Sequence, residues 1–395
     1  MTISYAEAMD KLAQCGQTHL LRFHKLLSDI QLANLLSQIE QLDVNSILEM
    51  QKKLQSAKEK ASFPDIEPAS VLELSEKQRP QMRNVGEALL KEGKVGIILV
   101  AGGQGTRLGF DGPEGCFEIG PVTRRSLYEI HARKVLNLQR RYFKEIPFYI
   151  MTSQENDMAT RRFFATHNYF GLSPELVIFF KQGMLPAMFP DGRIIMDRPD
   201  HIFFSPDGHG GVLKAMQVNG ILEDMRKRGL STLFYFQVDN PLVEIADPVF
   251  LGVHITEKAD MSLKVCAKRD PEEGLGVVVT RKGRNMLVEY SELTKEQKHA
   301  RDEKTGKLKF LYGSVAIHVF ALDFLEQMTS IQMPLHIAHK KIPWCDDTGK
   351  TIIPDKPNGY KFEKFIFDVL PFAKRSVNLV FNRQDEFSPV KNAEG

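Results

Sequence analysis

A glycine-rich turn directly after a buried strand constrains this chain more than any other feature of its sequence. The segment Lys94–Arg107 reads KVGIILVAGGQGTR, and its apolar run is continuous and β-branched rather than alternating. Such a run predicts a strand that is buried on both faces. The glycines that follow let the backbone turn sharply and bring its N–H groups close to a ligand. Thr106 and Arg107 supply a hydroxyl and a fixed cation, so we predict a nucleotide-binding turn.

Two common phosphate-binding motifs fit this turn poorly. A P-loop needs a glycine, four residues and then Gly-Lys-Ser/Thr, and no lysine follows these glycines. A dinucleotide fingerprint that starts at Gly103 has Gly105 in place, but Leu108 stands where the third glycine belongs. A turn that merely connects a strand to a helix is the remaining structural alternative.

Composition and charge are ordinary for a globular protein. The 395 residues allow two or three domains, and 43% of them are hydrophobic and 26% charged. A net charge of +2 indicates neither a nucleic-acid nor a membrane partner. Four scattered cysteines without a CxxC pair argue against a zinc site, and the first residues resemble no signal peptide. We therefore expect a cytoplasmic protein.

The pattern along the chain predicts a helical start followed by an α/β body. Apolar residues from Leu20 to Leu42 recur near helical spacing, which predicts helices up to about Lys60. Pro64 and Pro68 then separate this helical arm from the body.

Within the body, short apolar runs alternate with helical stretches. Strands are expected at 146–151, 177–180, 233–238, 276–280 and 287–290, and helices near 126–142, 157–167 and 211–228. This alternation predicts an α/β fold with a doubly wound, mostly parallel sheet. Ligands of such sheets bind at the carboxyl ends of the strands.

Asp239 ends one of these apolar runs and is followed by Asn240 and Pro241. A carboxylate at a strand end beside a phosphate-binding turn is suited to hold Mg²⁺. The alternative is that this aspartate caps the next turn.

Longer motifs follow one another along almost the whole chain. They are GQTHLLRF (Gly16–Phe23), LVAGGQGTRLGF (Leu99–Phe110), MTS (Met151–Ser153), HNYFGL (His167–Leu172), QGMLPAM (Gln182–Met188), SPDGHGGVLKAM (Ser205–Met216), VDNPLVEIADP (Val238–Pro248), VEYSEL (Val288–Leu293), HIAHKKIP (His336–Pro343), KPNGYKFEKFIFD (Lys356–Asp368) and DEFSPVKNAE (Asp385–Glu394). In these motifs the chain resembles the eukaryotic-type UDP-N-acetylhexosamine pyrophosphorylases, within the wider group of UTP:sugar-1-phosphate uridylyltransferases.

The resemblance implies an activity and a division into three parts. The reaction would join UTP and a sugar 1-phosphate, most simply an N-acetylhexosamine 1-phosphate, to give a UDP-sugar and pyrophosphate with Mg²⁺ as cofactor. The parts would be a helical arm (1–65), a Rossmann-like, GT-A-like nucleotidyltransferase domain (66–340) and a small C-terminal segment (341–395). It implies no nucleic-acid or membrane partner, and the oligomeric state stays open.

The resemblance also assigns roles to single residues. Those that would bind the nucleotide are Ala101, Gly102, Gly103, Gln182, Gly208 and Asp239, the last also as the metal ligand. Those that would bind the sugar are His209, Glu289, Tyr290 and Ser314. Those that would meet the phosphates are Arg107, Lys361 and Lys391. His336 and His339 stand three residues apart, as if on one helical face, and are taken as structural because no third metal ligand is evident.

Three positions depart from the family pattern. The family carries a lysine where this chain has Glu114, and losing such a donor costs roughly 10²- to 10³-fold in rate. Activity could be retained if Glu114 turns outward or if Arg107, Arg124 or Arg125 takes the phosphate role. A weakly active UDP-sugar-binding homologue is therefore one alternative. His209 and Ser314 stand where the N-acetylhexosamine enzymes carry asparagines, which keeps a UDP-glucose or UDP-sugar pyrophosphorylase as another.

Overall fold

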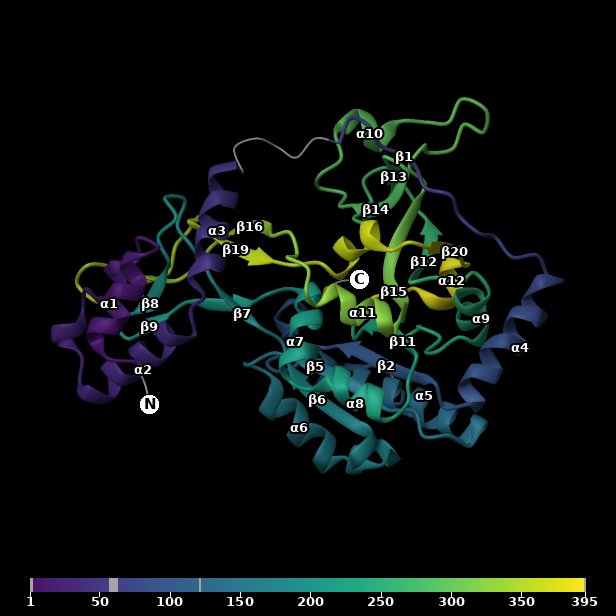
Figure 1. Ribbon diagram of the computed structural model, residues 1–395, viewed down its shortest axis with the longest axis horizontal. Helices are drawn as coiled ribbons and strands as arrows, with labels where there is room; N and C mark the ends of the chain where they lie inside the picture. The colour runs from purple at the N-terminus through teal and green to yellow at the C-terminus, as the bar shows by residue number, and fades with distance from the viewer. Residues whose placement is uncertain (1–2, 57–62, 121, 394–395) are drawn as a thin grey trace. The chain divides into compact units, whose positions relative to one another are not determined.

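The computed structural model describes residues 3–56, 63–120 and 122–393, which group into two units (Figure 1). The helical unit consists of Met1–Ala61, Gly183–Gly211 and Met333–Phe365. The sheet unit consists of Ser62–Gln182, Val212–Gln332 and Ile366–Gly395. The sequence led us to expect three consecutive domains, whereas each unit of the structure is built from several segments. The segments Gly183–Gly211 and Met333–Phe365 group with the N-terminal helices.

In its described residues the helical unit combines three α-helices and three short 3-10 helices with short strands. Its elements are α1 (Tyr5–Ala13), η1 (Thr18–Leu21), η2 (His24–Leu26), α2 (Asp29–Gln41), α3 (Val44–Ser56), β7 (Met184–Pro186), β8 (Met196–Arg198), β9 (His201–Ile202), β10 (Phe204–Pro206), η7 (His209–Gly211), β16 (His336–Lys340), β17 (Trp344–Cys345), β18 (Thr351–Ile352) and β19 (Gly359–Glu363), where η marks a 3-10 helix. Reciprocal side-chain caps start α1 at Ser4 and α2 at Ser28. Leu12, Leu35 and Ile39 bury their side chains in one core with residues of the later segments.

The strands of the sheet unit form one large mixed sheet. They are β1 (Glu67–Pro68), β2 (Val95–Val100), β5 (Phe148–Thr152), β6 (Val177–Lys181), β11 (Thr232–Gln237), β12 (Met261–Ala267), β13 (Val277–Arg281), β14 (Arg284–Val288), β15 (Tyr312–Ala321) and β20 (Ser376–Val380), with β3 (Glu118–Ile119) and β4 (Arg125–Ser126) as a separate pair. Strands β11, β2, β5 and β6 are parallel neighbours in that order, and β15 pairs antiparallel with β11.

The register of β2 and β11 brings two chain segments to the same edge of the sheet. Gln237 lies opposite Val100, and the N–H of Val238 donates to the carbonyl of Val100 at 3.1 Å. Ala101, which follows β2, and Val238, which follows β11 and precedes Asp239, therefore leave the sheet at the same edge.

Helices surround this sheet in the same unit (Figure 1). They are α4 (Gln78–Lys91), η3 (Gly105–Leu108), η4 (Glu114–Cys116), α5 (Leu127–Tyr142), α6 (Asp157–Thr166), η5 (Asn168–Gly171), η6 (Pro174–Leu176), α7 (Val212–Val218), α8 (Ile221–Lys227), α9 (Pro248–Thr256), α10 (Lys295–His299), α11 (Leu322–Met328), η8 (Ile366–Phe372) and α12 (Arg383–Glu386). Helices α4 and α9 approach closely, since a Cβ on Gly86 would lie 1.9 Å from the oxygen of Pro248 and one on Gly252 1.8 Å from that of Met82. No helix among the described residues is long and apolar enough to cross a membrane.

The α/β fold and its large central sheet confirm the expectation from the sequence, but several local predictions need correction. The helical stretch at 211–228 is two helices, divided at Gly220 with φ +70°. Leu20 lies in the 3-10 helix η1 and not in a long α-helix. The prediction missed this because the apolar spacing does not reveal the turn before α2. The expected helix end near Lys60 lies outside the described residues.

The two histidines of β16 do not share a helical face. His336 and His339 lie on a strand, where side chains three residues apart point to opposite faces. His336 stacks on Phe365 with ring centroids 4.2 Å apart, and His339 stacks on Tyr360 at 4.6 Å. These packing contacts agree with a structural role.

Candidate active site

The glycine-rich turn begins where β2 ends. The N–H of Ala101 donates to the carbonyl of Met151 at 2.9 Å and so continues the pairing of β2 with β5. A Cβ on Gly102 would lie 2.6 Å from Oε1 of Gln182, whose backbone N–H donates to Thr152 at the end of β5. Only glycine lets the Gln182 amide lie this close to the turn. The structure thus brings the turn and Gln182 together.

A buried asparagine fixes the shape of this turn. Nδ2 of Asn156 donates to the carbonyls of Ala101 at 2.9 Å and Gly103 at 3.1 Å. Its Oδ1 accepts the N–H of Ser153 at 2.8 Å, and the side chain is wholly buried. Sequence reasoning missed this residue, although it stands just beyond the MTS motif.

Replacing Asn156 by alanine is expected to loosen the turn. Two buried carbonyls would lose their donor, at a cost of about 2 kcal/mol of unfolding free energy. The misplaced N–H groups should raise KM for the nucleotide roughly 10-fold. Chemical denaturation and steady-state kinetics measure both effects. Asn137→Ala, at an exposed position of α5, is the matched control, and unchanged stability and KM in Asn156→Ala would contradict the assignment.

Asp239 lies two residues beyond the end of β11, next to the C-terminal segment. Its backbone carbonyl accepts the N–H of Val390 at 2.8 Å, and Nζ of Lys391 lies 3.7 Å from its Oδ2. Burial raises the pKa of this carboxyl, while Lys391 opposes the rise. The structure therefore brings two predicted site residues together from positions far apart in the sequence.

The loop after Asp239 has its own support. Nζ of Lys134 on α5 donates to the carbonyls of Pro241 at 2.6 Å and Val243 at 2.8 Å. Asn240 donates from Nδ2 to the carbonyl of Glu386 at 2.7 Å. Asp239 is thus held by a clamped loop rather than by a free turn.

Glu114 faces the same turn from η4. Its N–H donates to the carbonyl of Gly103 at 3.1 Å, and a Cβ on Gly103 would lie 2.7 Å from its Oε2. Burial raises the pKa of Glu114 to about 7, the negative charge of Asp239 adds to the rise, and Arg107 and Lys391 oppose it. Three charged predicted residues therefore act on Glu114 here: Asp239, Arg107 and Lys391.

This raised pKa predicts a pH-dependent stability. The folded state holds a proton on Glu114 that the unfolded state releases between about pH 4.5 and 7. The contribution of Glu114 to stability therefore falls as the pH rises through that window. Without divalent cations, Glu114→Gln should raise Tm by about 1–3 °C at pH 8 and not below pH 4.5. Thermal melts at both pH values measure the difference. Glu118→Gln on exposed β3 is the control, and a pH-independent gain would contradict the prediction.

The arginines near Glu114 differ in position. Arg107 lies on η3, where its carbonyl accepts the N–H of Ala393 at 3.2 Å, so the C-terminal segment passes beside it. Arg125 instead pairs with Glu129, at 3.4 Å between Nε and Oε1. Arg107 is therefore the better placed of these two to meet a phosphate.

The predicted sugar residues of the sheet unit gather around Gly276. The N–H of Ser314 on β15 donates to the carbonyl of Gly276 at 2.9 Å. A Cβ on Gly276 would lie 3.1 Å from Oε1 of Glu289, which directly follows β14. Tyr290 is exposed, and Nζ of Lys298 lies 5.8 Å from its ring centroid. These three residues form a second group in the sheet unit.

The remaining predicted residues belong to the helical unit. Gly208 has φ +81°, and a Cβ there would lie 2.5 Å from the carbonyl oxygen of Lys364. His209 stacks on Phe365 with ring centroids 5.1 Å apart. Nζ of Lys361 on β19 lies 5.2 Å from the ring centroid of Phe203.

One acidic cluster of the described residues resembles a metal site but already holds a cation. Glu244, Asp247 and Glu386 bring carboxylate oxygens within 4.8 Å of one another. Nζ of Lys264 lies 2.8 Å from Asp247 and 2.5 Å from Glu386, so two of the three carboxylates already share an ammonium. Asp239 is the better candidate for Mg²⁺, which proteins often bind through one or two carboxylates together with substrate phosphates.

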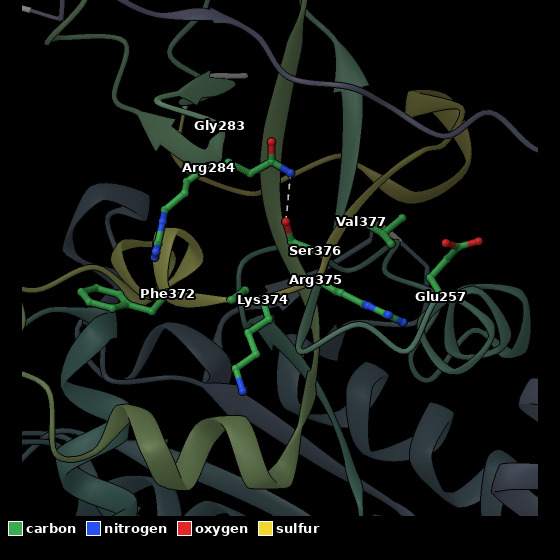
Figure 2. Close-up of a pocket in the computed structure, with 10 residues that line it drawn as sticks. Glu257, Gly283, Arg284, Phe372, Lys374, Arg375, Ser376 and Val377 are labelled. Atoms are coloured by element: carbon green, nitrogen blue, oxygen red, sulfur yellow. Dashed lines mark hydrogen bonds between the residues drawn. The ribbon is translucent and has the colours of Figure 1, made fainter.

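A cavity of about 840 Å³ elsewhere in the sheet unit is lined by the first residues of β14 and β20 (Figure 2). In that view Arg284 lies beside the Phe372 ring, Arg375 extends toward Glu257, and Lys374 points away from both. Because these cations do not converge, the cavity lacks the geometry that a phosphate group requires. The candidate active site is therefore the turn after β2.

Comparisons with known proteins identify the family of the chain. A family model described as UTP–glucose-1-phosphate uridylyltransferase matches residues 43–395. The probable UDP-N-acetylglucosamine pyrophosphorylase of Dictyostelium discoideum is 34% identical over 100% of this chain and 85% of its own length. The UDP-N-acetylglucosamine pyrophosphorylase of Saccharomyces cerevisiae is 37% identical over 97% of this chain and 85% of its own.

Solved structures extend the agreement to the fold. The uridine diphosphate N-acetylglucosamine pyrophosphorylase of Trypanosoma brucei, solved with an inhibitor, is 30% identical and superposes with a TM-score of 0.84. That match covers 100% of this chain and 82% of the other. The chain therefore belongs to the UTP–glucose-1-phosphate uridylyltransferase family of nucleotidyltransferases.

Proposed function

We propose that the protein converts UTP and an N-acetylhexosamine 1-phosphate, GlcNAc-1-phosphate or GalNAc-1-phosphate, to the UDP-N-acetylhexosamine and pyrophosphate. The observation that carries this proposal is the meeting of the glycine turn with Asp239 and Lys391 at the ends of β2 and β11. The names of the relatives support the same substrate class.

The chemistry needs charge control rather than a nucleophilic side chain. A phosphate oxygen of the sugar 1-phosphate attacks the α-phosphorus of UTP, and the bond from that phosphorus to the pyrophosphate oxygen breaks. The bonding electron pair leaves with pyrophosphate, where negative charge grows. Lys391 and Arg107 would offset this charge, with Lys361 as a further candidate.

Asp239 is the proposed ligand of Mg²⁺. A single part-buried carboxylate beside a phosphate-binding turn fits an ion whose other ligands are phosphate oxygens and water. When bound, Mg²⁺ neutralises charge on the phosphates. The backbone N–H groups of Ala101, Gly102 and Gly103 would hold the same phosphates.

Substrate recognition is assigned to rigid polar groups. Gln182, pressed against Gly102, and the backbone at Gly208 would read the uracil edge. Glu289 and Ser314, which meet at Gly276, would face the sugar, as would Tyr290 and His209. Discrimination between sugars is weaker when such a site lacks an amide partner for the sugar.

The finer organisation is part of the same proposal. The enzyme would consist of three parts: the arm 1–65, the Rossmann-like, GT-A-like domain 66–340 and the segment 341–395. The last segment would supply Lys361 and Lys391. The described cysteines are free and none pairs with another, which supports a reducing compartment, and we assign the protein to the cytoplasm.

A panel of sugar 1-phosphates tests this function directly. Pyrophosphate release is measured with UTP, Mg²⁺ and the 1-phosphates of GlcNAc, GalNAc and glucose. We expect the fastest turnover with an N-acetylhexosamine 1-phosphate. Turnover with glucose 1-phosphate alone would replace the proposal by a UDP-glucose pyrophosphorylase. Binding of a UDP-sugar without any turnover would leave a binding homologue, for which Glu114 would be the reason.

A further inference from the structure

A buried lysine of β12 is the most unusual charged group in the sheet unit. The side chain of Lys264 is 1% exposed, and its ammonium lies 5.4 Å from the ring centroid of Phe250. Burying an ammonium costs several kcal/mol unless charged partners surround it closely. An apolar side chain of similar length would avoid that cost. The ammonium therefore needs charged partners that offset it.

Lys264 binds two carboxylates from distant parts of the chain. Its Nζ donates to Oδ2 of Asp247 at 2.8 Å and to both carboxylate oxygens of Glu386, at 2.5 and 2.6 Å. Burial by itself lowers the pKa of Lys264. The carboxylates of Asp247 and Glu386 together raise this pKa by more than burial lowers it, so the net shift is upward. The lysine is therefore the charged link between the two carboxylates.

Each carboxylate ends a segment that leads to the candidate active site. Asp247 closes the loop that begins at Asp239, and its Oδ1 caps α9 by accepting the N–H of Val249 at 2.8 Å. Glu386 ends α12, and the next five residues carry the chain to Lys391. Lys264 thus connects the loop of the proposed metal ligand with the segment of a proposed phosphate-binding lysine.

Beyond Glu386, Phe387 and Val390 pack against the core of the sheet unit, and the N–H of Ala393 donates to the carbonyl of Arg107 at 3.2 Å. Near Asp239 the segment is held by two backbone hydrogen bonds. Asn240 accepts the N–H of Ser388 at 3.1 Å, and Asp239 accepts that of Val390 at 2.8 Å. Lys391 is exposed, so little packing restrains it. An anchor at Glu386 fixes the starting point from which this segment reaches Asp239.

We propose that Lys264 is a positioning residue whose buried ion pairs with Asp247 and Glu386 hold the C-terminal segment so that Lys391 stands beside Asp239. The inference rests on the proposed function insofar as Lys391 meets the phosphates. Lys264 itself does not touch Asp239 or Lys391 and acts through the segment.

The first test is amide hydrogen exchange on the full-length protein, which needs no turnover. Lys264→Met should speed exchange of the Val390 amide by about tenfold or more relative to the sheet strands. Val279→Ala, in the separate core cluster of β13, is a control that lowers Tm without this local effect. Equal exchange of Val390 in wild type and in folded Lys264→Met would overturn the proposal, whether or not the enzyme transfers uridylyl groups.

The second test is a double-mutant cycle on turnover. We expect Lys264→Met to lower kcat about 10- to 100-fold with a smaller change in the KM of the sugar 1-phosphate. In the background of Lys391→Ala the same change should cost little more, because the residue acts through Lys391. If the fold-losses in kcat of Lys264→Met and Lys391→Ala multiplied fully in the double variant, the proposal would be overturned. That result is expected when Lys264→Met disturbs the structure in general and does not act through Lys391.

A milder variant covers the case in which Lys264→Met does not fold. Glu386→Gln keeps the shape of the side chain and leaves Lys264 paired with Asp247. It should show the same faster exchange at Val390 and the same non-additivity with Lys391→Ala, each to a smaller extent. An unchanged Val390 amide in this variant would count against the proposal.

Discussion

Replacing Asp239 by asparagine is expected to lower kcat about 10³-fold or more. The carboxylate lies at the end of β11, beside the glycine turn, and it is the group that we propose binds Mg²⁺. Losing the ion would remove several kcal/mol of charge stabilisation as pyrophosphate leaves, and about 4 kcal/mol corresponds to a factor of 10³. Pyrophosphate release at saturating UTP measures the loss.

Two further measurements separate a metal ligand from a structural aspartate. Mn²⁺ binding, followed by electron paramagnetic resonance in the presence of UTP, should weaken in Asp239→Asn. Asp385→Asn, at an exposed position of α12, makes the same chemical change nearby and should leave turnover and Mn²⁺ binding unaltered. Wild-type Mn²⁺ binding and turnover in Asp239→Asn would show that the carboxylate only caps the loop.

Replacing Glu114 by lysine is expected to raise kcat about 10²-fold. In the present chain a carboxylate faces the turn where the triphosphate is proposed to bind. Two like charges about 4 Å apart repel by about 4 kcal/mol at an effective dielectric constant of ~20. An ammonium at the same place would attract the phosphates instead. Initial rates of pyrophosphate release with UTP and GlcNAc-1-phosphate measure the gain.

The control for this charge reversal is Glu118→Lys. Glu118 lies exposed on β3, four residues further on, so the same change of charge occurs away from the turn. Its rate should stay within about twofold of wild type, because surface charges are strongly screened. Equal turnover in Glu114→Lys and wild type would mean that Glu114 does not oppose the substrate.

The parts of the fold that could be predicted are those with a strong local signal. The continuous apolar run of β2 predicts a buried strand, which is present. The glycines after it predict that another group lies close to the backbone of the turn, and the side chain of Gln182 does so at Gly102. Strand β11 and Asp239 at its end followed from the same reasoning. The division of 211–228 into two helices was missed, since Gly220 interrupts an otherwise helical pattern by one residue.

The parts that could not be predicted depend on contacts between distant segments. Asn156 is one polar residue in a turn until its amide meets the carbonyl of Ala101, 55 residues earlier. Lys264 stands in the run MSLKV, where a lysine normally indicates a solvent-facing position. Its burial becomes explicable only when Asp247 and Glu386 are brought to it.

The packing of Gly115 has a consequence for how this enzyme can change over generations. A Cβ on Gly115 would lie 2.3 Å from the Tyr128 ring, and the N–H of Glu114 is bound to Gly103, so the backbone here is fixed whatever side chain position 114 carries. The codons of glutamate and lysine differ only in their first base. One point mutation in the gene can therefore reverse the charge at the turn without disturbing its scaffold, and selection for or against catalysis can act on that base alone.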